Sequence, residues 1–328
     1  MYKRQVLLAA FVQKEWKDQT RSPFDWQGFA AIVLFMPLAI YALARGNSPS
    51  NPGGWSAPEV IGCFIVAGAA LAWFIAAELR NPAPLLQIRL LAERNFGISM
   101  AVLTLFAIGM LGGTYLLPLY MQRGLGYTAL AAGSMFLPVG VIQGVLSAVS
   151  GYLTRYVRPL LLSAAGILVM ALSFWLASRF TLHTTHGHIL FILYLRGFGM
   201  GLTFAPLNLF SLKNLTQQDM AAAAGISNSI KQLAGSIGIA LLTVILSART
   251  SYHAAHETIS AAQTYVEGVT DALRVVAVIT LAALLPLLWV FRKKRPEKSG
   301  VKGAATPSPG EAVSGKTDKT TIYRTKPE

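Results

Sequence analysis

The stretch from Gly225 to Gly238, GISNSIKQLAGSIG, carries amides, hydroxyls and one lysine inside a long apolar run. Asn228, Lys231 and Gln232 follow the i, i+3, i+4 spacing that gathers side chains on one helix face. A helix that begins at Thr216 places Lys231 roughly 22 Å along its axis, well inside a hydrocarbon layer about 30 Å thick. Because an ammonium at that depth costs roughly 2.5 to 3.5 kcal/mol, this face must look into a polar interior.

The composition of the whole chain indicates a membrane protein. Of its 328 residues 54% are hydrophobic and only 13% are charged, and the mean hydropathy is +0.51. A soluble domain has about 25% charged residues. We therefore predict an all-α polytopic membrane protein with eight transmembrane helices, at residues 24–45, 57–79, 96–121, 128–152, 159–178, 188–211, 217–247 and 271–292.

The basic residues predict which side of the membrane each connection occupies. The net charge of +14 suggests nucleic acid in a soluble protein, but here the positive-inside rule explains it, so we expect no nucleic-acid partner. If the N-terminus is cytoplasmic, most Lys and Arg residues outside the spans fall on the inner side. The sequence thus predicts a multi-pass protein of the bacterial cytoplasmic (inner) membrane, with both termini of this chain in the cytoplasm.

Four parts follow from this pattern. Residues 1–23 contain an apolar run of seven residues, too short to span, and we expect it to be the end of a helix whose beginning is missing. Residues 24–79 hold two helices, and residues 96–292 hold six. The link 248–270 is predicted to be a long polar extracytoplasmic loop, and residues 293–328 a disordered basic cytoplasmic tail.

Polar side chains in mid-span assign roles to the helices. They concentrate in the third, fourth, sixth and seventh spans, which we expect to line a shared interior, whereas the other four can face lipid. Structural roles stay open as alternatives to a role in the cavity. Each cation could instead cap backbone carbonyls or extend outward along its stem. Each amide could instead bond to a neighbouring helix. The candidate residues of the substrate cavity and its coupling are Tyr115, Gln143, Arg196, Asn208, Asn228, Lys231 and Gln232.

No catalytic, metal or cofactor site is predicted. All five histidines fall between or next to spans, in the sequences HTTHGH and HAAH, which we interpret as solvated outer loops. Their spacing could serve a metal ion or a pH-sensitive gate, but no cysteine or fixed scaffold accompanies them. Cys63 is the single cysteine, so no intramolecular disulfide can form.

Several segments taken in order resemble a known family. They are SPFDWQGF, FIAAELRNPAPLLQIRLLAERNF, GLGYTALAAG, LPVG, LRGFGMG and ISNSIKQLAGSIG. Together they resemble the second half of the fourteen-helix drug:proton antiporters of the major facilitator superfamily, the EmrB/QacA-like branch. The likeness runs from about residue 22 to residue 291. It implies that the first two spans are the family's central pair and that the other six form its C-terminal half.

The resemblance also implies a function. It suggests a proton-coupled multidrug efflux transporter that works by alternating access, with small amphipathic substrates, protons and the lipid bilayer as partners, and a periplasmic adaptor and outer-membrane channel as further partners. The family's six N-terminal helices, which are expected to hold the proton-coupling carboxylates, have no counterpart in this sequence. The alternatives are a polytopic membrane enzyme, which lacks a nucleophile or base cluster here, and an inert transporter fragment.

Overall fold

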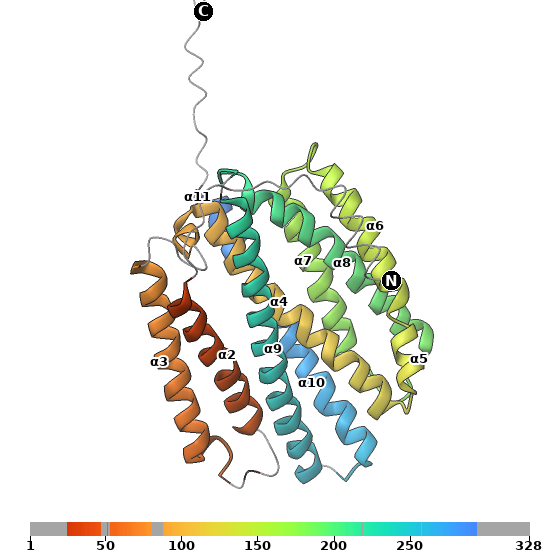
Figure 1. Cartoon of the computed structure of the whole chain (residues 1–328). Helices are drawn as coiled ribbons and strands as arrows, with labels where there is room; N and C mark the ends of the chain where they lie inside the picture. The colour runs from red at the N-terminus through yellow and green to blue at the C-terminus, as the bar shows by residue number, and fades with distance from the viewer. Residues whose placement is uncertain are drawn as a thin grey trace, which may run out of the picture. The chain divides into compact units, whose positions relative to one another are not determined.

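The computed structural model describes residues 25–46, 51, 53–80, 88–217, 219–256 and 258–293. Every regular element within these ranges is helical. Eight of the described segments are long and apolar enough to cross a membrane. The prediction of an all-α polytopic membrane protein with eight spans is therefore confirmed (Figure 1).

Six of the eight spans are single long helices, and two are broken. The π-helical turn Tyr120–Gly124 follows Pro118, which has no N–H to donate to the preceding turn. The fourth span breaks just before Pro138, and the eighth at Ala283. In chain order the helices are α2 (Trp26–Gly46), α3 (Pro58–Arg80), α4 (Arg94–Leu119), α5 (Ala129–Ser134), α6 (Leu137–Leu153), α7 (Pro159–Ala177), α8 (His186–Leu212), α9 (Met220–His256), α10 (Ala261–Ala282) and α11 (Leu284–Lys293).

The predicted long polar link at 248–270 is wrong. Helix α9 continues to His256 and α10 begins at Ala261, so the connection is short. The polar residues that made this segment look like a loop contact one another across the two helices. Asp271 Oδ2 of α10 lies 3.1 Å from His253 Nε2 of α9. Hydropathy alone stops a span where such residues begin, because it cannot register bonds to a neighbouring helix.

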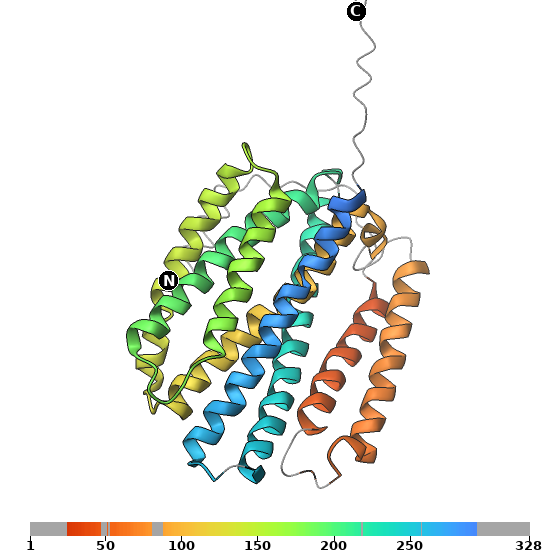
Figure 2. The ribbon, with the colours of Figure 1, turned by 180° about the vertical axis from the view of Figure 1, so that it is seen from behind.

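The helices from α4 to α10 form one bundle. Helix α4 contacts α8, α9 and α10, while α7 packs on both α8 and α10, and α6 packs on α8. Figure 1 shows α6, α8, α4 and α9 from one side, and Figure 2 shows α7 and α10 in front when the molecule is seen from behind. The four spans with polar mid-sections therefore share one side of the bundle.

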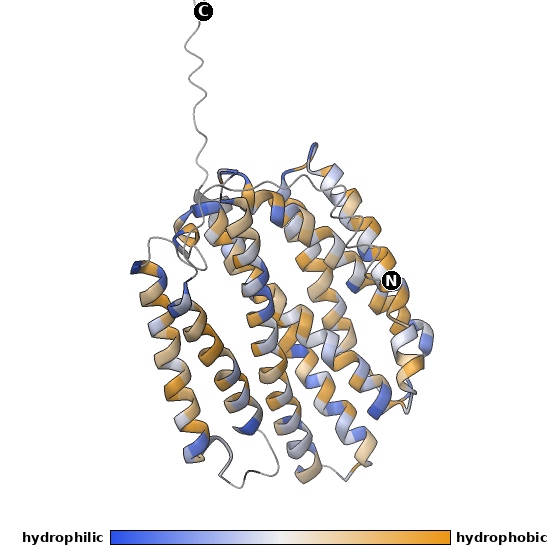
Figure 3. Cartoon of the chain, in the orientation of Figure 1, coloured by the Kyte–Doolittle hydropathy of each residue, from blue (hydrophilic) through white to orange (hydrophobic). Residues whose placement is uncertain are grey.

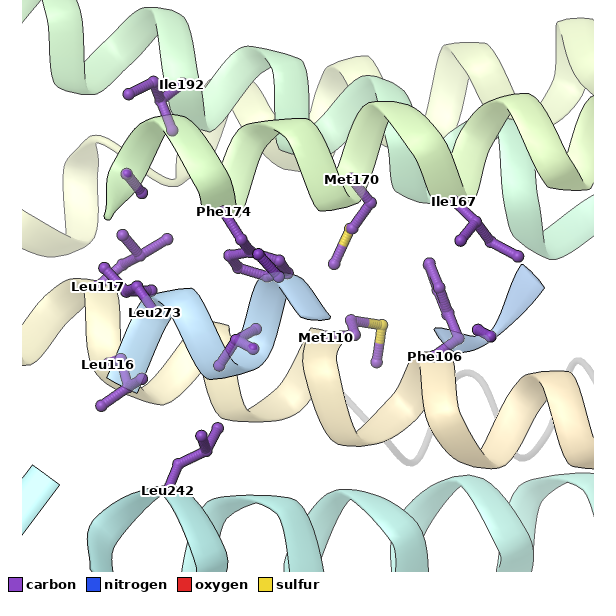
Figure 4. Close-up of a cluster of buried hydrophobic side chains, with 14 of the residues drawn as sticks. Phe106, Met110, Leu116, Leu117, Ile167, Met170, Phe174, Ile192, Leu242 and Leu273 are labelled. Carbon is purple, nitrogen blue, oxygen red and sulfur yellow. The ribbon is translucent and has the colours of Figure 1, made fainter. Parts of the chain in front are cut away.

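The core lies between α4, α7 and α10 (Figure 4). Phe106 and Met110 of α4 and Phe174 of α7 are almost entirely buried there. Helices α7 and α8 meet backbone to backbone, because a Cβ atom added at Gly199 would lie 2.8 Å from the carbonyl oxygen of Gly166. Such small residues let membrane helices pack closely where no hydrophobic force drives them together.

Helices α2 and α3 form a hairpin with its own small cluster of Ala42, Ala57 and Val60. Its turn is held by Asn51, whose Nδ2 donates to the carbonyl oxygens of Arg45, at 3.2 Å, and Gly54, at 3.0 Å. The outer surfaces of both helices are apolar (Figure 3). Their assignment to a separate central part of a larger transporter remains a prediction.

Candidate functional site

Helix α9 carries the polar stretch, and two glycines fix its orientation against α4. A Cβ atom at Gly238 would lie 2.8 Å from the Cα and carbonyl oxygen of Ile108, and one at Gly235 would overlap Leu111. The glycine face of α9 therefore rests on α4. Asn228 and Lys231 are left on the side of α9 that borders a hollow.

This hollow has a volume of about 360 Å³ and lies between α4, α8 and α9. Its size falls near the lower end of the roughly 300 to 1,000 Å³ that small-molecule sites occupy. Its lining residues from α8 and α9 lie near the C-terminal end of α8 and the N-terminal end of α9, and Figure 1 shows that these two helix ends lie at the same end of the bundle. The lining residues are Leu103, Phe204, Asn208, Ser211, Leu212, Ala224, Ser227, Asn228 and Lys231.

The polar groups of the hollow are of two kinds. The hydroxyl of Ser211 donates to the carbonyl oxygen of Asn208, at 2.8 Å, and that of Ser227 to the carbonyl oxygen of Ala223, at 2.7 Å. Within the described ranges, the side chains of Asn208, Asn228 and Lys231 make no hydrogen bond or ion pair. The hydroxyls thus have only acceptor capacity left, while the amides and the ammonium retain all their donors.

Arg196 lies elsewhere, in the closed part of the bundle. Its side chain is 2% exposed, and its Nη2 donates to the carbonyl oxygen of Met110, at 3.1 Å, and to Thr114 Oγ1 of α4. The guanidinium carbon is 5.9 Å from the ring centres of both Phe136 and Phe174. This is the geometry of a cation that joins α8 to α4, and Arg196 does not line the hollow that Lys231 borders.

Comparison with known proteins gives the family. The Major Facilitator Superfamily profile matches residues 22–239, about two thirds of the chain. The chain belongs to the Major Facilitator Superfamily.

Three curated superfamily relatives carry names that refer to export or resistance. The multidrug export protein EmrB of Escherichia coli (strain K12) is 31% identical over 73% of this chain and 46% of its own length. The puromycin resistance protein pur8 of Streptomyces alboniger is 31% identical over 82% and 54%. The fatty acid resistance protein FarB of Neisseria gonorrhoeae is 28% identical over 71% and 45%. The chain spans about half the length of these relatives.

A solved structure of the same fold is similar as well. It is a bacterial homolog of the human lysosomal transporter Spinster, in an inward-facing and occupied conformation. The TM-score is 0.52 at 12% identity, over 80% of this chain and 66% of that one. This likeness supports the fold of the superfamily member and carries no inference about its substrate.

Of the four polar helices expected to line one interior, α4, α8 and α9 line this hollow, and α6 contributes none of its described lining residues. Helix α6 packs against α8 because Gly201 admits its backbone: a Cβ there would lie 3.0 Å from the carbonyl oxygen of Gln143. Ser150 of α6 donates to the carbonyl oxygen of Gly201 at 2.9 Å. The Ser150 hydroxyl and the backbone of α6 at Gln143 thus lie at the interface with α8.

The remaining predicted residues of the superfamily member lie outside the hollow. Gln143 is half-buried on α6, Gln232 is exposed on α9 and Tyr115 is exposed on α4. Two polar lining residues, Ser211 and Ser227, were not predicted from the sequence. Helical spacing could have found both, because each is three or four residues from a predicted amide or lysine on the same helix.

A second hollow, of about 580 Å³, lies between α6 and α8. Its walls are almost wholly apolar, and they include Val141, Val145, Phe191 and Phe198. A site that orients a ligand needs a few convergent polar groups, and the smaller hollow has them. We therefore take the hollow lined by Asn208, Asn228 and Lys231, the "Lys231 hollow", as the candidate site.

The histidines are placed on helices more often than predicted. His186 and His188 lie in α8 and His253 and His256 in α9, whereas His183 lies in the preceding turn. The outer-loop interpretation is therefore wrong for four of the five. Within the described residues no group of three or more His, Cys, Asp or Glu side chains could hold a metal ion.

Proposed function

We propose that this superfamily member works in multidrug efflux, exporting amphipathic drugs or toxic compounds across the bacterial cytoplasmic membrane by proton-coupled alternating access. In this proposal α2 and α3 are the central pair and α4 to α11 the C-terminal half of a fourteen-helix antiporter. The relatives named above support the class of substrate, because two of the three are named for drug export or antibiotic resistance.

The observation that carries the proposal is the Lys231 hollow. Three polar side chains without bonds to the described protein converge on one space between three membrane-spanning helices. Structural polar groups in such helices are normally bonded to a neighbour, so unbonded ones beside a hollow are available to a ligand. Alternating access needs a site of this kind between helices that move against a facing bundle.

In this proposal, polar and apolar lining residues of the hollow bind different parts of the substrate. Asn208, Asn228 and Lys231 would hold the polar part of the substrate, and Leu103 and Phe204 its apolar part. No Asp or Glu lines this hollow among the described residues, so the proton-coupling carboxylates of the proposal belong to a facing bundle. A periplasmic adaptor and outer-membrane channel remain proposed partners.

The test is co-expression with the N-terminal helices of EmrB in cells that lack their own multidrug exporters. We expect efflux of a lipophilic fluorescent dye under an imposed pH gradient only when both pieces are present and co-purify. A protonophore should abolish it. Co-purifying pieces that never move dye would contradict the proposal.

A matched pair of lysine variants locates the site within that assay. Lys231→Met should abolish efflux with expression unchanged, because it removes the charged group of the hollow. Lys213→Met is the control, since Lys213 is exposed at the end of α8 and does not line the hollow. Equal efflux from the two variants would count against the site.

A further inference from the structure

The charge of the Lys231 hollow indicates which ligands it accepts. Lys231 is the one charged residue among its described lining residues. Asp219 precedes α9, so it lies roughly 18 Å from Lys231 along the helix axis. Glu93 precedes α4, roughly 15 Å along the axis from the lining residue Leu103. Both acids are also engaged, Asp219 with Thr216 and Glu93 with Asn214. The hollow therefore has uncompensated positive charge within the described chain.

The hydrogen-bonding groups favour the same ligand. The hydroxyl hydrogens of Ser211 and Ser227 are used within their own helices. The available donors are the ammonium of Lys231 and the side-chain amides of Asn208 and Asn228. A carboxylate has two oxygens that only accept, and its bonds to an ammonium are among the strong, charge-assisted ones. A quaternary ammonium has no group to accept these donors and meets a like charge.

The apolar wall limits the rest of the ligand. Leu103, Phe204 and Leu212 line the hollow beside the polar groups. A volume of about 360 Å³ holds about a dozen non-hydrogen atoms, if each takes the roughly 30 Å³ of a water molecule in the liquid. A medium-length alkyl carboxylate fits this size.

We propose that the Lys231 hollow binds the carboxylate of an amphipathic monoanion, with Lys231 as the charge partner and Asn208 and Asn228 as further donors. The inference rests on the proposed function in that the hollow is taken as the substrate site. It narrows the substrate class from amphipaths in general to carboxylates with an alkyl or aromatic body. A carboxylate side chain from a facing bundle would supply the same chemistry, and the experiment distinguishes the two sources.

The binding experiment uses the full chain in nanodiscs of zwitterionic lipid with radiolabelled decanoate as the probe. Unlabelled decanoate should displace the label, whereas decanol and decyltrimethylammonium should not. Lys231→Met should weaken binding roughly tenfold or more, and Lys231→Arg should keep it. Lys213→Met, the exposed lysine outside the hollow, should bind like the unchanged chain.

Charge reversal makes the test two-sided. Lys231→Glu should lose decanoate and gain decyltrimethylammonium, because the sign of the one lining charge is inverted. Asn228→Leu keeps the lysine and should weaken decanoate binding by a smaller factor, which maintains the test if a Lys231 variant does not fold. The inference would be overturned if Lys231→Met bound decanoate as tightly as the unchanged chain. It would also be overturned if decyltrimethylammonium displaced the label as well as decanoate does.

Two outcomes separate this inference from the proposed function. If the chain alone binds no decanoate but the co-expressed pieces export a cationic dye, Lys231 pairs with a protein carboxylate, and the substrate inference fails while export stands. If the chain binds decanoate through Lys231 but the co-purified pieces move neither dye nor decanoate, the site stands and export fails. Binding together with decanoate efflux supports both.

Discussion

Arg196 and Lys231 are both cations in the middle of long membrane-spanning helices, yet the protein surrounds them differently. Arg196 is buried to 2% exposure, and α4 and two aromatic rings surround its guanidinium. Lys231 is half-buried beside a hollow, and its ammonium has no bond to the described protein. Their similar depth in sequence therefore conceals two different environments: Arg196 bonds α4, and Lys231 has no bond within the described protein.

The chemistry of the two side chains suits those environments. A guanidinium has several donors in a fixed plane, and Arg196 uses one nitrogen to reach both Met110 and Thr114 of α4. An ammonium is a compact charge on a flexible stem that can follow a ligand. The alternative of a cation that caps backbone carbonyls, left open by the sequence, thus describes Arg196 and does not describe Lys231.

The largest expected effect comes from reversing the buried charge. Arg196→Glu would place a carboxylate against the carbonyl oxygen of Met110, which has no hydrogen to donate. An uncompensated buried charge of this kind costs on the order of 3 to 5 kcal/mol. We expect loss of most monodisperse protein in fluorescence-detected size-exclusion chromatography, whereas Lys231→Glu elutes normally. Normal elution of both variants would remove the distinction between the two cations.

A smaller effect is expected at Gly199, where α8 packs closely against α7. Gly199→Ala places a Cβ against the backbone of α7 at Gly166 and Met170, where overpacking costs roughly 1 to 3 kcal/mol. The matched control is Gly225→Ala on α9, which meets no atom within 4 Å. Thermal unfolding in detergent should show a lower midpoint for Gly199→Ala and an unchanged or higher one for the control. Equal midpoints would mean that the closed region is no tighter than α9.

The sequence was sufficient for the number of spans and for part of the site, but it ended the seventh span too early and began the eighth too late. Helical spacing predicted correctly that Asn228 and Lys231 share a face, and both line one hollow with Asn208 of α8. The sequence did not predict that the Arg196 side chain points toward α4. That orientation depends on how α8 is rotated, and glycines of α8 set this rotation where they let α8 pack closely on α6 and α7. Spacing also placed Gln232 on that face, where the structure has it exposed outside the hollow, because a narrow site takes only part of a wide helical stripe.

A third arrangement of charge, near the α9–α10 connection, gives an intermediate case. Asp271 accepts from Arg274 Nη1 at 2.8 Å and lies near Arg249, at 3.7 Å, and His253, at 3.1 Å. Both arginines are more than half exposed, so each pair contributes only about 0.2 to 1 kcal/mol. Asp271→Asn should lower the unfolding midpoint slightly, and the difference should shrink in high salt. A salt-independent loss would show that the cluster acts as a buried network.

The smallest expected change in stability is at Lys231 itself, and it tests the comparison most directly. Lys231→Gln removes a charge that has no partner in the described protein, so no bond is lost and no buried group is left without one. Substitutions away from such features usually change the free energy of unfolding by less than about 0.5 kcal/mol. The unfolding midpoint should therefore match that of the unchanged chain when no ligand is present. In saturating decanoate the unfolding midpoint of the unchanged chain should rise above that of the variant, because a ligand that binds only the folded state stabilises it. A large loss of stability without ligand would instead place Lys231 beside Arg196 as a cation that holds helices together.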